Sequence, residues 1–413
     1  MGGDPADRAG LPVSGPAAVN LVERAEPHLP GLVRLRRHLH AVPEVGLRLP
    51  RTQAALLDAL SGLGLAIRTG SACTSVVAVV EGQLPGETVL LRADMDALPI
   101  GEDSGEPFAS DNGCMHACGH DLHMAGLVGA ARLLTEVRSQ LRGRVVLMFQ
   151  PGEEGHDGAQ VMLDEGLLKT TATPPVAAYA LHVGPGRAGT MWTRPGAILA
   201  GMGTLRITVR GAGGHASAPH DTLDPVPVLA EIVLALQSHV TRRHRVFDPV
   251  VLSVTRLQAG DAVNVIPGSA TLEASVRALS ADAVGQLRTQ VQDLASHIAR
   301  AHGMEAGSVF ADHYPVTCND PAETEFAVRT ASRVLGRNAV DPAHPALMGS
   351  EDFSKVLARV PGALVFMGTT PPDLDPATAP GVHSPQARFT DRTLPLHAAL
   401  LAQLAFDRLA SGS

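Results

Sequence analysis

Short apolar segments of this chain lead repeatedly and directly into acidic or histidine residues. Three such runs, at residues 88–93, 145–150 and 177–182, are bounded by turn residues and have the length of buried strands. They alternate with helical patterns, as the strands of an α/β domain with a largely parallel sheet do. Because ligands bind at the carboxyl ends of strands in open α/β sheets, the residues after these runs are expected to converge on one crevice.

The residues at these strand ends are typical of metal-assisted hydrolysis. Asp94 and Asp96 lie around the end of the first strand, Glu153 and Glu154 follow the second, and His182 ends the third. One carboxylate of the Glu153-Glu154 pair can bind a metal while the other takes a proton from an activated water. A charged surface loop is the alternative interpretation of this pair.

The densest group of metal-binding side chains lies at residues 116–123, which read HACGHDLH. The Cys118 thiolate and the His120 imidazole are good ligands for zinc and similar divalent ions. Gly119 between them lets the backbone turn so that both side chains face one point. A buried free cysteine beside surface histidines is the alternative.

Two further histidines complete a candidate ligand set. His182 and His383 are weak signals singly, because a lone histidine near a strand end is more often a hydrogen-bonded structural residue. Together with Cys118, His120 and Glu154 they make more ligands than one tetrahedral zinc needs. This number suits two metals that share a bridge.

Asp94 and Asp96 suit a supporting role beside such a centre. Carboxylates at a strand end can hold ligand histidines in orientation through hydrogen bonds to the ring nitrogen that faces away from the metal. The alternative is that they cap the following turn.

A break in composition near residues 194–196 introduces a second pattern, of strand, helix, two strands, helix and strand. The β-α-β-β-α-β order predicts a ferredoxin-like α+β unit inserted in the larger domain. Its expected elements are strands 205–210, 250–257, 271–277 and 308–313 with helices 226–240 and 281–301. Leu205, Ile207 and Val209 alternate with polar residues, so one face of this sheet is expected to be covered and the other exposed to solvent. We therefore expect a disordered extension at 1–18, a catalytic metal-binding domain at 19–194 and 314–413, and an inserted lid and dimerisation domain at 195–313.

Composition limits which classes of partner the protein can bind and where in the cell it is expected. A formal net charge of −8 lacks the basic field that nucleic acid or an anionic membrane would require. No long apolar run or signal-like segment is present, and 4 scattered cysteines are too few to staple 413 residues. The sequence predicts a cytoplasmic protein that binds a small-molecule or peptide-like substrate, without nucleic-acid or membrane partners.

These motifs together resemble the M20 metallopeptidase family, in particular its amidohydrolase branch. That branch hydrolyses N-acyl amino acids, hippurate and auxin conjugates. The resemblance implies a zinc-peptidase-like α/β catalytic domain with a mainly parallel central sheet and an inserted ferredoxin-like α+β lid. It rests on segments 92–99 (RADMDALP), 115–121 (MHACGHD), 150–155 (QPGEEG), 213–216 (GGHA), 264–267 (NVIP), 349–353 (GSEDF) and 383–385 (HSP).

The resemblance also implies roles for individual residues. Glu153 corresponds to the general base that activates a bridging water. Each subunit would bind two divalent metal ions, which could be zinc, manganese, cobalt or nickel. Their ligands would be Cys118, His120, Glu154, His182 and His383.

Three lid residues match family positions that contact the substrate. His215 would steady the tetrahedral oxyanion, in its own active site or in that of a homodimer partner. Asn264 and Arg277 would hold the substrate's carboxylate. A histidine in a glycine-rich turn and an arginine in a surface salt bridge are the alternative interpretations.

The predicted function is that of a metal-dependent amidohydrolase that cleaves the amide bond of N-acyl amino acids or related conjugates. A di- or tripeptidase with the same machinery is the nearest alternative, and a non-catalytic metal-binding protein is a more distant one. Pure binding has no need of an unliganded carboxylate beside Glu154, which disfavours the second alternative. Gly152, Ala387 and Arg392 depart from the branch's usual alanine, aromatic and acidic residues, and the last two leave the substrate open.

Overall fold

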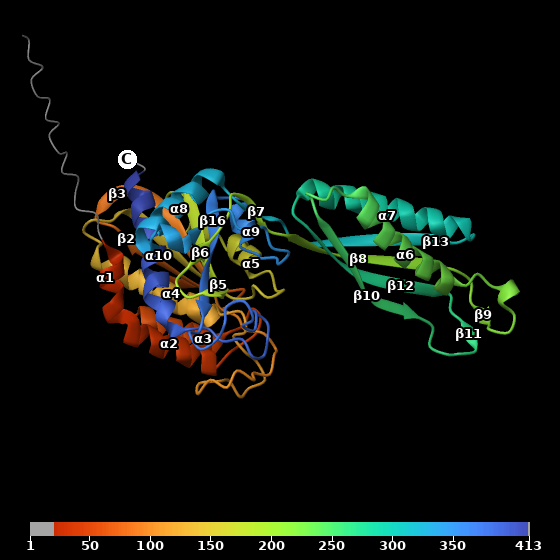
Figure 1. Ribbon diagram of the computed structural model, residues 1–413, viewed down its shortest axis with the longest axis horizontal. Coiled ribbons are helices and arrows are strands. Elements are labelled where there is room, and N and C mark those ends of the chain that lie inside the picture. Colours follow the sequence, from red (N-terminus) through yellow and green to blue (C-terminus); the bar gives the residue numbers. More distant parts are fainter. Residues whose placement is uncertain (1–19, 412–413) are drawn as a thin grey trace, which may run out of the picture.

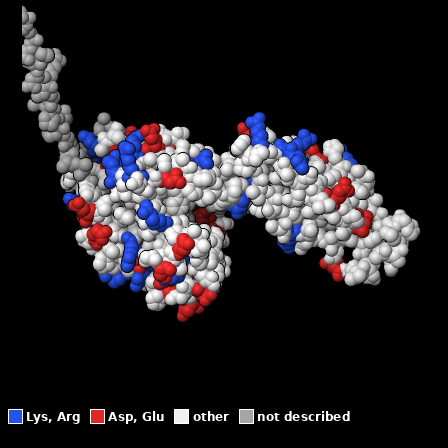
Figure 2. All heavy atoms as spheres, in the orientation of Figure 1, with Lys and Arg blue, Asp and Glu red and all other residues white. Residues whose placement is uncertain are grey.

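The computed structural model describes residues 20–411, so the extension expected at 1–18 lies outside the described residues. Figure 1 shows two bodies joined by a narrow connection. The larger body contains residues 20–200 and 315–411, and the smaller body contains residues 201–314. On the face shown in Figure 2, acidic and basic side chains are interspersed over both bodies.

An eight-stranded sheet in the order β1-β2-β4-β3-β5-β16-β6-β15 forms the centre of the larger body. The central strands β4, β3, β5 and β16 run parallel to one another. Pairing is antiparallel between β1 and β2, β2 and β4, and β6 and β16. The expected α/β fold with a mainly parallel sheet is confirmed, with antiparallel strands added toward its edges. The strands are β1 Ala66–Thr69, β2 Val76–Glu81, β3 Leu84–Asp94, β4 Arg142–Gln150, β5 Ala177–Arg187, β6 Met191–Trp192, β15 Val340–Asp341 and β16 Gly362–Thr370.

Helices cover both faces of this sheet. Almost every side chain of α4 is buried, because α4 is apolar nearly all round and lies between the sheet, α2 and α10. Helices α5 and α9 pack on the opposite face through Met162 and Val356. The helices are α1 Leu21–Ala25, α2 Leu29–Ala41, α3 Pro50–Leu60, α4 His120–Glu136, α5 Gly158–Asp164, α8 Pro321–Leu335, α9 Ser354–Leu357 and α10 Leu394–Ser411. Within residues 20–411, no helix is long and apolar enough to cross a bilayer.

The smaller body is an antiparallel sheet in the order β10-β12-β8-β13 with two helices on one face. Leu205, Ile207 and Val209 alternate along β8 and are fully buried under these helices, as the alternating pattern predicted. The strand order is that of a ferredoxin-like unit. Its elements are β8 Gly201–Arg210, α6 Pro225–Arg243, β10 Val250–Ala259, β12 Ser269–Ala278, α7 Ala281–Ala301 and β13 Glu305–Tyr314.

Two short strands join the bodies. β7, Gly196–Leu199, pairs antiparallel with β14, Thr317–Asn319. Ile198 and Leu199 of β7 pack in the hydrophobic core of the larger body, with Phe353 and Leu364. The sheet of the smaller body therefore begins at Gly201, later than the domain boundary expected at residue 195.

Candidate metal centre and active site

The carboxyl ends of the parallel strands bring the expected site residues to one edge of the sheet. Asp94 ends β3, the Glu153-Glu154 pair follows β4, and His182 lies on β5 next to β3 and β16. The Cys118 and His120 segment enters α4 at the same edge. Gly119 between them has a φ of 81°, a left-handed conformation that favours glycine.

All five side chains expected to bind metal lie close together. Ligand atoms of Cys118, His120 and Glu154 are within 4.8 Å of one another. Cys118 Sγ lies 3.5 Å from His182 Nε2, and His383 Nε2 lies 3.0 Å from Glu154 Oε1. The loop of His383 is fixed to this cluster by its own backbone, because the His383 N–H donates to the Ala117 carbonyl at 2.9 Å.

One buried atom in this cluster, His120 Nε2, has no hydrogen-bond partner. His120 Nδ1 is 2.8 Å from the Asp96 carbonyl, and His182 Nδ1 is 2.6 Å from the Val183 carbonyl. Each Nδ1–H therefore donates to the backbone, and each Nε2 lone pair is left facing the cluster. Because unpartnered polar atoms are costly to bury, these residues fit a bound cation.

The charges of the cluster favour metal ligation. Burial would raise the pKa of the Cys118 thiol, but the facing His182 and His120 rings lower it to about 6. The opposed Cys118 and Glu154 groups raise the pKa of His383 to about 10. A thiolate, a carboxylate and imidazoles are the ligand types that zinc and related transition metals bind.

His123 lies beside the cluster without a free nitrogen. Its Nδ1 is 2.5 Å from Asp94 Oδ1, and its Nε2 accepts the Val183 N–H at 2.8 Å. His123 therefore links Asp94 to the strand that carries His182 and orients that strand. Sequence reasoning missed this residue, although its position three residues after His120 on α4 places both on one helix face.

Asp96 holds the turn that carries the paired glutamates. Its two carboxylate oxygens each accept a backbone N–H at 3.0 Å, one from Glu153 and one from Glu154. Gly152 has a φ of 75° in this turn, and a Cβ built there would lie 2.5 Å from Leu47 Cδ2. The departure from alanine at this position thus matches the packing of Leu47.

A buried network of charges lies behind the turn. Arg92 Nη1 donates to Asp94 at 2.6 Å, and Arg92 Nη2 donates to Glu351 at 2.7 Å and Asp352 at 3.3 Å. Burial, followed by the charges of Glu351, Glu154 and Asp352, raises the pKa of Glu153 well above its ordinary value. A carboxyl group in this environment can hold a proton near neutral pH.

The three residues expected to contact the substrate lie in the smaller body, away from the metal cluster or at the junction. His215 is on β9, Gly214–His215, which pairs with β11, Val265–Ile266, and Asn264 immediately precedes β11. Figure 1 shows this pair of strands at the end of the smaller body remote from the larger one, so one chain does not bring His215 or Asn264 to the metal cluster.

Arg277 lies at the opposite end of the smaller body, on β12. Its Nη1 donates to the Met348 carbonyl at 2.8 Å and lies 3.4 Å from Ser350 Oγ. Arg277 therefore contacts the segment that leads into Glu351 and Asp352.

A strand-end cluster of thiolate, imidazole and carboxylate groups, with one carboxylate left outside the ligand set, defines a metal-dependent hydrolase. The chain belongs to peptidase family M20/M25/M40, whose sequence model matches residues 90–407. The predicted resemblance is thereby confirmed, as is the class of hydrolase acting on amide or peptide C–N bonds. Family membership and the ligand groups both support divalent metal binding.

Relatives with assigned activities are similar over most of the chain. An N-acetyl-L-cysteine deacetylase of Bacillus subtilis is 36% identical, over 82% of this chain and 80% of its own length. IAA-amino acid hydrolase ILR1-like 4 of Arabidopsis thaliana is 35% identical over 91% and 84%. A solved dinuclear metal-binding M20 peptidase from Bacillus subtilis superposes with a TM-score of 0.80 at 30% identity, covering 93% of this chain and 99% of that one.

Proposed function

We propose that this protein removes the acyl group from N-acyl amino acids or related conjugates by hydrolysis of their amide bond. The observation that carries the proposal is the buried His120 Nε2, which has no hydrogen-bond partner and lies in one group with Cys118 and Glu154, while the adjacent Glu153 stays outside the ligand set. The names of the deacetylase and of the auxin-conjugate hydrolase point to the same substrate class.

The site would hold two divalent ions through the five clustered side chains. When bound, such ions supply Lewis acidity and lower the pKa of a water. The thiolate and the carboxylate offset their charge, and the backbone carbonyls behind His120 and His182 fix the ring orientations. The residues in this role are Cys118, His120, Glu154, His182 and His383.

Glu153 would transfer the proton. Its backbone N–H is fixed by Asp96, and burial together with the charges of Glu351 and Asp352 raises the pKa of its carboxyl group, which makes the ionised form a stronger base. Glu153 would take a proton from the attacking water and then give it to the leaving amine nitrogen.

A second copy of the chain would complete the site. The oxyanion of the tetrahedral species requires a donor, and His215 and Asn264 lie at the remote end of their own chain's smaller body. Val263 and Val265 beside them are 103% and 51% exposed, which favours burial against another surface. We propose that the smaller body is a lid and dimerisation domain and that His215 acts in the site of the partner subunit.

The test is Glu153→Gln in protein stripped of metal and reloaded separately with zinc, manganese, cobalt or nickel. Substrates are N-acetyl and N-benzoyl amino acids and free dipeptides. Turnover should fall by about 10² to 10⁴ with metal content unchanged. Glu325→Gln, on the exposed side of α8, is the control and should retain wild-type turnover.

Two outcomes would contradict the proposal. Full turnover by Glu153→Gln at unchanged metal content would remove Glu153 from the mechanism. Cleavage of free dipeptides in preference to acyl substrates would favour a peptidase, which is the activity named for a relative from Saccharolobus solfataricus, thermostable carboxypeptidase 2, 34% identical over 82% of this chain.

A further inference from the structure

The two chain segments that connect the bodies lie against each other at Gly201 and Tyr314. Met202 and Tyr314 are register partners where β8 and β13 enter the smaller body. A Cβ built on Gly201 would lie 3.0 Å from the Val316 nitrogen and 3.2 Å from the Tyr314 carbonyl oxygen. A change in the orientation of the smaller body is therefore passed directly to the backbone of Tyr314.

The side chain of Tyr314 reaches from this connection to the turn that carries Glu153. Its hydroxyl donates to the Glu153 carbonyl at 2.7 Å and accepts the Gly155 N–H at 3.0 Å. Tyr314 is only 7% exposed, so these bonds lie largely out of solvent. The turn is thus held on one side by Asp96 from the central sheet and on the other by Tyr314 from the connection.

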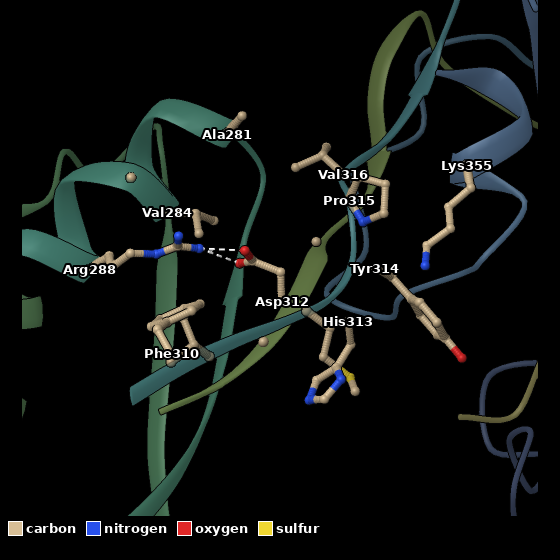
Figure 3. Close-up of a pocket in the computed structure, with 15 residues that line it drawn as sticks. Ala281, Val284, Arg288, Phe310, Asp312, His313, Tyr314, Pro315, Val316 and Lys355 are labelled. Atoms are coloured by element: carbon tan, nitrogen blue, oxygen red, sulfur yellow. Dashed lines mark hydrogen bonds and ion pairs between the residues drawn. The ribbon is translucent and has the colours of Figure 1, made fainter. Parts of the chain in front are cut away.

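A pocket of about 550 Å³ lies next to this connection. Figure 3 shows Tyr314 directed away from the Arg288–Asp312 ion pair that lines one side of the pocket. Lys355 lies on the other side, where its Nζ is 5.7 Å from the Tyr314 ring centroid and 2.5 Å from Asp157 Oδ1. The pocket therefore leaves open volume beside the connection.

We propose that Tyr314 is a positioning residue that makes the placement of Glu153 depend on the orientation of the smaller body. The proposal rests on the proposed function of Glu153 as the proton-transferring group. Rotation of the smaller body moves the Tyr314 hydroxyl, and the hydroxyl moves the Glu153 carbonyl and the Gly155 amide with it. Because Asp96 fixes the other side of the turn, movement of the Tyr314 hydroxyl rotates the Glu153 residue.

The first variant is Tyr314→Phe, which removes both hydrogen bonds and keeps the ring. We expect kcat to fall about tenfold with KM unchanged within about twofold, because the loss of hydrogen bonds misplaces the proton-transferring group without touching the substrate. The control is Tyr179→Phe, the other of the 2 tyrosines, whose hydroxyl donates to Glu323 away from the turn. The control should leave kcat unchanged.

The second variant, Gly201→Ala, tests transmission. Its added methyl group must push the Val316 and Tyr314 backbone away, so hydrogen–deuterium exchange of the peptide covering residues 151–159 should speed up by at least about threefold. In a Tyr314→Phe background the same substitution should change exchange in this peptide by less than about 1.5-fold, because the link is already broken.

Equal effects of Gly201→Ala in both backgrounds, on exchange or on kcat, would overturn the proposal. The exchange measurement needs no turnover, so it tests Tyr314 independently of the proposed function. An inactive wild-type protein would refute the proposed function, and the comparison of Gly201→Ala in the two backgrounds would still decide the role of Tyr314. Should Tyr314→Phe fail to fold, Gly201→Ala alone must still accelerate exchange at residues 151–159. Unchanged exchange there would equally reject the role.

Discussion

The larger body buries charged side chains beneath its site, whereas the smaller body keeps them on its surface. Arg92 contacts Asp94, Glu351 and Asp352 with almost no exposure to solvent. Among residues 201–313, no charged side chain is buried, and the core consists of apolar residues such as Leu205 and those of α6 and α7.

This difference follows from what each body has to hold. Ligand and proton-transfer groups need fixed orientations, and buried hydrogen-bonded charges provide them. The smaller body needs only a rigid sheet, which an apolar core supplies. The single tryptophan, Trp192, stacks on Phe366 in the larger body, so its fluorescence reports the unfolding of that body alone.

The largest effect should come from Arg92→Met in the larger body. Removal of the guanidinium leaves three buried carboxylates without their cation, which should lower the free energy of unfolding by about 3–5 kcal/mol. Urea unfolding of metal-free protein followed by tryptophan fluorescence measures the loss. A loss below about 1 kcal/mol would show that this network is not what stabilises the larger body.

Truncation of one core leucine in each body should show whether the two bodies unfold independently. Leu205→Ala in the smaller body and Leu91→Ala in the larger body each remove a fully buried side chain and should cost about 2–5 kcal/mol. Leu205→Ala should lower the unfolding midpoint measured by circular dichroism and leave the midpoint measured by tryptophan fluorescence unchanged. Leu91→Ala should lower both midpoints. If both variants shifted both signals equally, the bodies would unfold as one cooperative unit.

The pH dependence of stability should reside in the larger body. Burial alone would lower the pKa of His40, but the Asp121 carboxylate raises it from 6.5 to about 9. Because the folded-state pKa is the higher one, this stabilisation is complete below pH 6.5 and is lost as pH rises through about 9.

The shift corresponds to about 3 kcal/mol at most. Fluorescence-detected urea midpoints between about pH 6 and 10 should fall for the wild type and stay flatter for His40→Gln. A wild-type advantage that did not change with pH would exclude a charged His40 in the native state.

The smallest effect should come from Asp312→Asn in the smaller body. Arg288 and Asp312 have side chains that are 46% and 62% exposed, so their ion pair is screened by water and salt. We expect a loss of about 0.2–1 kcal/mol by circular dichroism, and a smaller one at high salt. A loss as large as that of Arg92→Met would erase the contrast between the two bodies.

The amino-acid sequence alone was enough to predict the main elements and the segments that meet at the candidate site. Apolar runs that lead into Asp94, Glu153 and His182 predicted the convergence that the sheet produces, because parallel strands share one carboxyl edge, although β5 continues past His182 to Arg187. The alternation of Leu205, Ile207 and Val209 likewise predicted which face of the smaller sheet is covered. These features are local or periodic, and local patterns can be read along a chain.

Only the tertiary structure shows which polar atoms already have hydrogen-bond partners and which remain available to bind a metal. His123 looks as good a ligand as His120, yet Asp94 and the Val183 N–H take both of its nitrogens. Tyr314 carried no signal beyond its place at the end of a strand, and its contact with Glu153 spans the junction of the two bodies. Hydrogen bonds between distant segments have no sequence period, and they depend on side-chain placements that only the folded packing fixes.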